Sequence, residues 1–152
     1  MAEVWFYQLT ATPVEQVAPD LLERALARGW RAVLRSGLEP ALAMLDAALW
    51  SYRDDAFLPH GTAAMGHAER QPVWLTCGNE NPNGASLLML VFGARVDPGE
   101  VARYERVCLL FEGGDSEALV AAREDWKAVT AAGLAARYWA QEGGRWIEKA
   151  RN

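Results

Sequence analysis

Short apolar runs rich in β-prone residues alternate with stretches of helical spacing along most of this chain, and this alternation restricts the folds available to it. The expected strands are residues 4–9, 30–36, 73–77, 87–92 and 106–112. Stretches of helical apolar spacing occupy residues 14–28, 40–50 and 115–132. Such alternation is typical of domains in which helices cover both faces of a largely parallel sheet. We therefore expect a three-layer α/β domain.

The expected helices carry recognisable start and stop signals. Thr12 and Glu15 form a capping-box pattern around Pro13, which is expected at the first helical position. Asp115 or Ser116 is expected to cap the long helix, and a glycine follows its last residue. Proline at position 19 predicts a kink or a restart of the first helix.

Two connections leave the sheet topology open. Residues 78–86 are too few for a helical crossover, so strands 73–77 and 87–92 are either an antiparallel pair or not adjacent parallel strands. Residues 138–149 are expected to form a hairpin around Gly143 and Gly144. We therefore expect a largely parallel central sheet, with a mixed sheet as the alternative. Residues 51–72 are polar and rich in turn formers, which predicts an extended loop.

The length and charge of the chain limit its function. A chain of 152 residues fits a single domain, here taken as 1–152, that buries about 70% of its unfolded surface. Cys77 and Cys108 lie in apolar runs and are expected to be buried free thiols of a reducing cytosol. No apolar run approaches the roughly 20 residues of a membrane span, so we expect a cytoplasmic protein without a membrane contact. The net charge of −5 and the lack of a basic run disfavour direct nucleic-acid binding.

Catalytic and cofactor sites find little support in the sequence. Gly113 and Gly114 follow an expected strand and precede a helix, where phosphates bind in many α/β proteins. A small nucleotide-binding domain or enzyme that uses this turn is therefore the alternative function, although no complete phosphate-binding motif is present. His60 and His67 match no zinc pattern, and neither cysteine has an activating neighbour. We expect no metal, no cofactor and no catalytic residue.

One segment, LDAALWSYRDDAFLPHG at residues 45–61, is the most distinctive of the chain. It resembles the LDEALW…FxPH run of the chi subunit family of bacterial DNA polymerase III. Further segments are similar to that family in the same order: WFYQL, LLERALARGWRAVLR, ERQPVWLTCGNENPNGASLLMLVFGA and YERVCLLFEGGDSEALVAAREDWKAVTAAG. The resemblance covers nearly the whole chain.

The resemblance implies a Rossmann-like fold, no catalytic activity and two protein contacts. One face would bind a psi-like subunit and so connect the chain to the clamp loader. The matched positions for this contact are Phe57, Leu58, Pro59 and His60, with a loop packed on its own core as the alternative. A helicase that uses the same face is another candidate partner. The other face would bind the acidic C-terminal tail of single-stranded-DNA-binding protein, which ends in phenylalanine.

Arg123 and Lys127 carry chemistry suited to that tail. They lie four residues apart on one helix, so they share a face, and an arginine fork suits a terminal carboxylate. The alternative is that they pair with Glu124 or other acids on a solvated helix face. Trp50 is the expected aromatic wall for the phenylalanine, and Trp139, with its neighbour in the tail, is expected to border the site.

Two residues of the same helix modify this expectation. Trp126 fits a core stripe by its spacing and is therefore interpreted as structural. Leu119 stands where the family often has a further basic residue, one turn before Arg123. This difference predicts fewer charge contacts and a weaker affinity for the tail.

Overall fold

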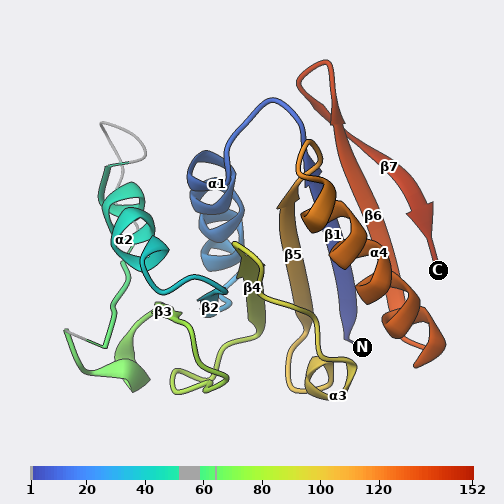
Figure 1. The fold of residues 1–152 in the computed structure, drawn as a ribbon. Helices are drawn as coiled ribbons and strands as arrows, with labels where there is room; N and C mark the ends of the chain where they lie inside the picture. Colours follow the sequence, from blue (N-terminus) through green and yellow to red (C-terminus); the bar gives the residue numbers. More distant parts are fainter. Residues whose placement is uncertain (1, 52–58, 64) are drawn as a thin grey trace.

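The computed structural model describes residues 2–51, 59–63 and 65–152. Within them the chain forms one seven-stranded sheet of order β3-β2-β4-β5-β1-β6-β7, together with four α-helices (Figure 1). The strands are β1 (Glu3–Leu9), β2 (Ala32–Ser36), β3 (Val73–Thr76), β4 (Leu87–Val91), β5 (Arg106–Glu112), β6 (Ala135–Glu142) and β7 (Arg145–Arg151). The helices are α1 (Val14–Ala27), α2 (Ala41–Ser51), α3 (Pro98–Val101) and α4 (Ser116–Ala131).

The sheet is parallel except at one edge, where β6 and β7 form an antiparallel hairpin. Strands β3 and β4 both pair with β2 in parallel and lie on either side of it. They are therefore not adjacent parallel strands, as the second alternative expected, and the ten residues 77–86 connect them without a helix. The expected hairpin is confirmed: Gly143 and Gly144 both have positive φ, as the tight turn of a type I′ hairpin requires.

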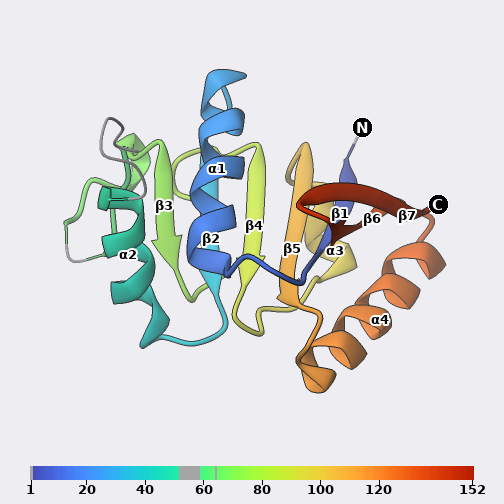
Figure 2. The same ribbon diagram turned by 90° about the horizontal axis from the view of Figure 1, so that it is seen from above.

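The helices cover the sheet in two layers, so the three-layer Rossmann-like α/β architecture is confirmed. Helices α1 and α2 pack on one face through residues such as Leu22 and Leu45, in a core that includes Leu34 and Met89. Helix α4 packs on the opposite face through Ala122 and Val129. In Figure 2 the sheet extends from β3 at one edge to the β6–β7 hairpin at the other, and α4 lies at the hairpin end.

The expected start signal holds for α4 but not for α1. Asp115 caps α4, because its carboxylate accepts hydrogen bonds from two backbone amides of the first turn. The capping box predicted at Thr12 is wrong, since Pro13 is the N-cap residue of α1 and no side-chain cap is formed. The Thr12 hydroxyl instead accepts a hydrogen bond from Gln141 at 3.2 Å. Helix α1 continues through Pro19 without a restart.

Only one of the two cysteines is buried as expected. Cys108 is buried, as predicted, but Cys77 is exposed just beyond the end of β3, so that half of the prediction is wrong. In the described part of 51–72, helix α2 extends through Ser51 and a 3₁₀ turn forms at Ala68–Arg70.

Among the helices that the structure describes, none combines the length and hydrophobicity needed to cross a bilayer. The described residues also contain no group of three or more histidine, cysteine, aspartate or glutamate side chains positioned to hold a metal ion.

Candidate functional site

A groove of about 450 Å³ lies between α4 and the β6–β7 hairpin. The turn spacing of α4 places three of its side chains on the face that lines this groove, and strands β1, β6 and β7 contribute the rest. The lining residues are Gln8, Arg123, Trp126, Lys127, Tyr138 and Ala150.

The aromatic side of the groove is held in place by the core. Trp126 is half-buried, with its ring edge-on to Phe6 at a centroid distance of 5.3 Å and to Tyr138 at 6.0 Å. The Tyr138 hydroxyl donates a hydrogen bond to the Gln8 side-chain oxygen. Burial raises the pKa of Tyr138, although Arg123 opposes the shift, so the phenol stays protonated as a donor at neutral pH. The groove therefore has a preformed aromatic wall.

The glycine at position 113 helps to position Gln8. A Cβ atom at Gly113 would lie 2.7 Å from the Gln8 side-chain nitrogen. Any other residue there would push Gln8 aside and disturb its hydrogen bond to Tyr138. A close approach of backbone to side chain thus explains this glycine without a bound phosphate.

The cationic side of the groove is exposed and unneutralised. Arg123 and Lys127 are exposed, and their side chains make no hydrogen bond or ion pair with the part of the chain that the structure describes. The acids beside them on α4 face Arg95 instead: it lies 3.3 Å from the Glu124 carboxylate and 2.7 Å from that of Asp125. Asp125 also accepts a hydrogen bond from the backbone amide at position 96. The alternative in which Arg123 and Lys127 pair with neighbouring acids is thus not observed among the described residues.

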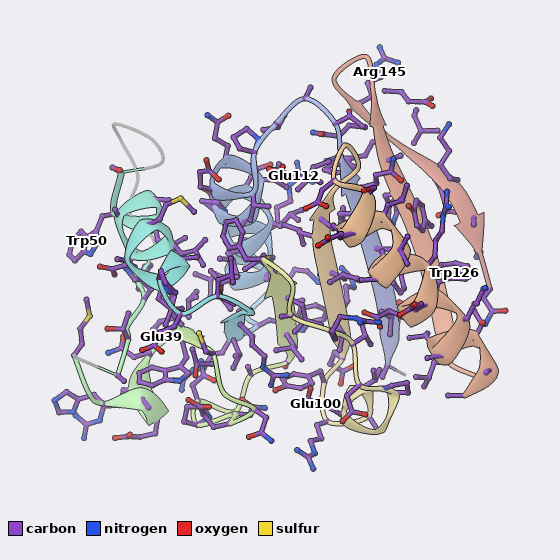
Figure 3. The ribbon with its side chains drawn as sticks, viewed as in Figure 1. Glu39, Trp50, Glu100, Glu112, Trp126 and Arg145 are labelled. Carbon is purple, nitrogen blue, oxygen red and sulfur yellow. The ribbon has the colours of Figure 1, made fainter. Side chains whose placement is uncertain are left out.

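Two residues expected at this site lie elsewhere. Trp139 follows Tyr138 on β6, and successive side chains of a strand point to opposite faces of the sheet. Trp139 therefore lies on the other face, where its ring centroid is 5.6 Å from that of Trp5. Trp50 is on α2, and Figure 3 shows it and Trp126 at opposite ends of the molecule. The aromatic wall beside Arg123 therefore consists of Trp126 and Tyr138. The sequence signal for Trp126 was its spacing of three from Arg123, which is also a core spacing.

The segment around residue 60 is only partly described. Phe57 and Leu58 lie outside the described residues, whereas Pro59 is exposed. His60 is buried, and its Nε2 atom lies 2.6 Å from an Asp46 carboxylate oxygen. Because His60 is buried, it is not positioned to contact a partner directly. The Trp50 ring packs edge-on against it, with 54% of the tryptophan exposed.

The turn at Gly113 and Gly114 lacks the features of a phosphate site. The Asp115 carboxylate already occupies the amide groups at the start of α4. Glu112 and Glu117 add further negative charge around the turn. Like charge repels a phosphate, so this arrangement argues against the nucleotide-binding alternative.

Comparison with known proteins gives the family. A sequence model of the family described as "DNA polymerase III chi subunit, HolC" matches residues 1–137. The chain belongs to the DNA polymerase III chi subunit family. Members of this family are non-catalytic accessory subunits of the replicative polymerase. The chi family match ends just before Tyr138, so the hairpin side of the groove lies largely beyond it.

Two relatives support the assignment. "DNA polymerase III subunit chi" of Pseudomonas aeruginosa is 36% identical over 114 residues, which are 72% of this chain and 77% of that protein. "Probable DNA polymerase III subunit chi" of Rickettsia prowazekii is 28% identical over 87 residues, or 57% of this chain. The match spans 50% of the Rickettsia chi protein.

Proposed function

We propose that this chain is a non-catalytic replisome adaptor that links the clamp loader, through a psi-like subunit, to the C-terminal tail of single-stranded-DNA-binding protein. The observation that carries the proposal is the groove beside α4. There two cations without ion-pair partners in the described chain lie next to a half-buried tryptophan. Membership in the chi family supports the replication context.

The chemistry of the groove fits an acidic peptide that ends in an aromatic residue. The Arg123 guanidinium can donate two parallel hydrogen bonds to a terminal carboxylate, and Lys127 adds attraction for acidic residues before it. The terminal ring would pack against Trp126 and Tyr138, which present an apolar surface. Capture of a free C-terminal carboxylate is a recurring mode of peptide recognition.

A second surface, at the other end of the sheet, suits the psi-like partner or a helicase. Trp50 and Pro59 are exposed there, and both belong to the segment 45–61 that resembles the family. Exposed tryptophans are frequent anchors of protein interfaces. Because this surface shares no residue with the groove, both partners could bind at the same time.

Fluorescence anisotropy with two labelled peptides tests the tail contact. One is an acidic peptide that ends in a free phenylalanine, and the other is the same peptide amidated at its C-terminus. The free acid should bind, with an affinity that falls as salt rises, because the contact is partly electrostatic. Amidation and the variant Arg123→Ala should each weaken binding about tenfold or more.

Arg145→Ala is the matched control. Arg145 is exposed at the hairpin turn and lies outside the groove, so its loss removes one positive charge without touching the site (Figure 3). This variant should bind like the unmodified chain. Equal binding of the free and amidated peptides, or full affinity in Arg123→Ala, would exclude carboxylate capture at this groove.

A further inference from the structure

A second pocket, of about 220 Å³, lies on the opposite face of the sheet from the groove. It is formed by the C-terminal half of α1 and by strands β1, β4 and β5. Its floor is apolar, with Leu87 and Met89 from β4, and its walls include Trp5 and Trp30. Three arginines complete the lining: Arg24 of α1, Arg28 at the C-cap of α1 and Arg106 of β5.

Two of these arginines are stacked on the tryptophans. The Arg106 guanidinium carbon is 3.7 Å from the Trp5 ring centroid, and that of Arg28 is 4.0 Å from the Trp30 ring centroid. Neither side chain forms an ion pair or hydrogen bond with any residue that the structure describes. These contacts place each guanidinium group beside a ring but use none of its N–H groups. Two cations therefore remain available to an oxyanion.

The third arginine is engaged only at the surface. Arg24 lies 3.6 Å from Asp20 on the same exposed face of α1, and such an exposed ion pair contributes little to stability. The pocket mouth therefore carries a local positive charge on a protein whose net charge is −5. Charge complementarity selects an acidic ligand for this mouth.

The arrangement favours an acidic peptide over single-stranded nucleic acid. Bases bind by stacking on free aromatic faces. Here Arg106 lies over Trp5 and also 5.3 Å from the Trp30 centroid, while Arg28 covers Trp30 more closely. The guanidinium groups thus occupy faces that a base would need. The half-buried Leu21 at the pocket wall, by contrast, offers a place for a hydrophobic side chain next to a bound carboxylate.

We propose that this pocket binds an acidic segment of a partner protein, with a carboxylate held by Arg28 and Arg106 and an adjacent apolar side chain packed against Leu21. This contact is independent of the proposed function, because it uses none of the groove residues and requires no free C-terminus. It would give the chain a third protein-binding surface, on the α1 face of the sheet.

Titration of the full chain with a model peptide, followed by the indole N–H signals in proton–nitrogen NMR spectra, tests this site. The probe is a short peptide of alternating aspartate and leucine, acetylated and amidated so that it cannot act as a terminal carboxylate. We expect saturable shifts of the Trp5 and Trp30 signals and no comparable shift of the Trp126 signal. The shifts should weaken at high salt, because the contact depends on unpaired charges.

Arg28→Gln is the test variant, since Arg28 is exposed and its replacement is compatible with folding. It should weaken peptide binding about tenfold, whereas the matched variant Arg145→Gln should leave it unchanged. Arg106→Gln should act in the same direction, with the dispersion of the spectrum reporting that the chain is folded.

Two comparison ligands complete the test: a peptide of alternating asparagine and leucine, and a short oligothymidylate. Shifts with the acidic peptide alone would support the proposal. No shift, or equal shifts with the asparagine peptide, would overturn it, and shifts with oligothymidylate alone would replace it with a nucleic-acid site. Failure here leaves the result of the tail-peptide experiment unaffected, because Arg123 takes no part in this pocket.

Discussion

At the scale of single residues, the two cysteines show how similar sequence surroundings can give different chemistry. Cys108 is in the middle of β5 and fully buried, and burial raises the pKa of its thiol to about 12. Cys77 lies just after the short strand β3, where the chain leaves the sheet. Desolvation, Glu39 and Glu80 together raise the pKa of Cys77 above its usual value.

These differences predict a selective thiol reaction. With a disulfide reagent at pH 8, only the thiol of Cys77 should react in the folded chain. It should react more slowly than the thiol of free cysteine, because its raised pKa leaves little of it as thiolate. The second thiol should react only after denaturation. A colorimetric thiol assay with and without denaturant measures both steps, and Cys77→Ser should abolish the first. Rapid reaction of two thiols in the folded protein would show that β5 opens readily.

At the scale of elements, the position of α4 depends on a side chain that never touches the groove. The Asp125 carboxylate is buried and accepts hydrogen bonds from Arg95 and from the Val96 backbone amide. These contacts tie α4 to the segment that follows β4. Arg123 and Lys127 project from the same helix, so the geometry of the groove depends on this tie.

Asp125→Ala should therefore have two effects. It leaves the Val96 amide without its acceptor and removes the main partner of Arg95, which should lower the free energy of unfolding by about 2 kcal/mol. Binding of the tail peptide should also weaken, because α4 is less firmly placed. Urea denaturation and the anisotropy assay measure the two effects. Glu124→Ala, which removes an exposed partner of Arg95, is the control and should change stability by less than about 0.5 kcal/mol.

The same scale shows where sequence reasoning succeeds. The longer elements follow from local patterns, whereas the four-residue helix α3 was not expected. Asp115 caps α4 because a cap requires only neighbouring amides. The predicted cap at Thr12 does not form. Its hydroxyl oxygen instead accepts a hydrogen bond from Gln141, which is 129 residues away in the sequence. The placement of β3 and β4 on either side of β2 likewise depends on long-range pairing. Local windows contain no information about such partners.

At the scale of the whole molecule, the sequence predicted the cations of the candidate site but not its aromatic wall. Arg123 and Lys127 share a helical face by spacing alone, and the groove includes both. Trp50 was assigned to the same site, although α2 and α4 lie at opposite ends of the sheet and on opposite faces. A sequence match aligns residues along the chain, and only the strand order determines which of them meet.

The separation of the two ends leads to the last prediction, that the proposed contacts are thermodynamically independent. Trp50→Ala should weaken binding of the psi-like subunit and leave tail-peptide affinity unchanged, whereas Arg123→Ala should do the reverse. Sites without shared residues or a moving element between them usually give additive effects.

Calorimetric titration of each partner in the presence of the other measures the coupling directly. If the sites are independent, each dissociation constant should stay within about twofold when the second partner is bound, since a larger change means a coupling free energy between the sites. Loss of tail binding in Trp50→Ala would instead mean that α2 and α4 respond to each other through the sheet. The two contacts would then be energetically coupled.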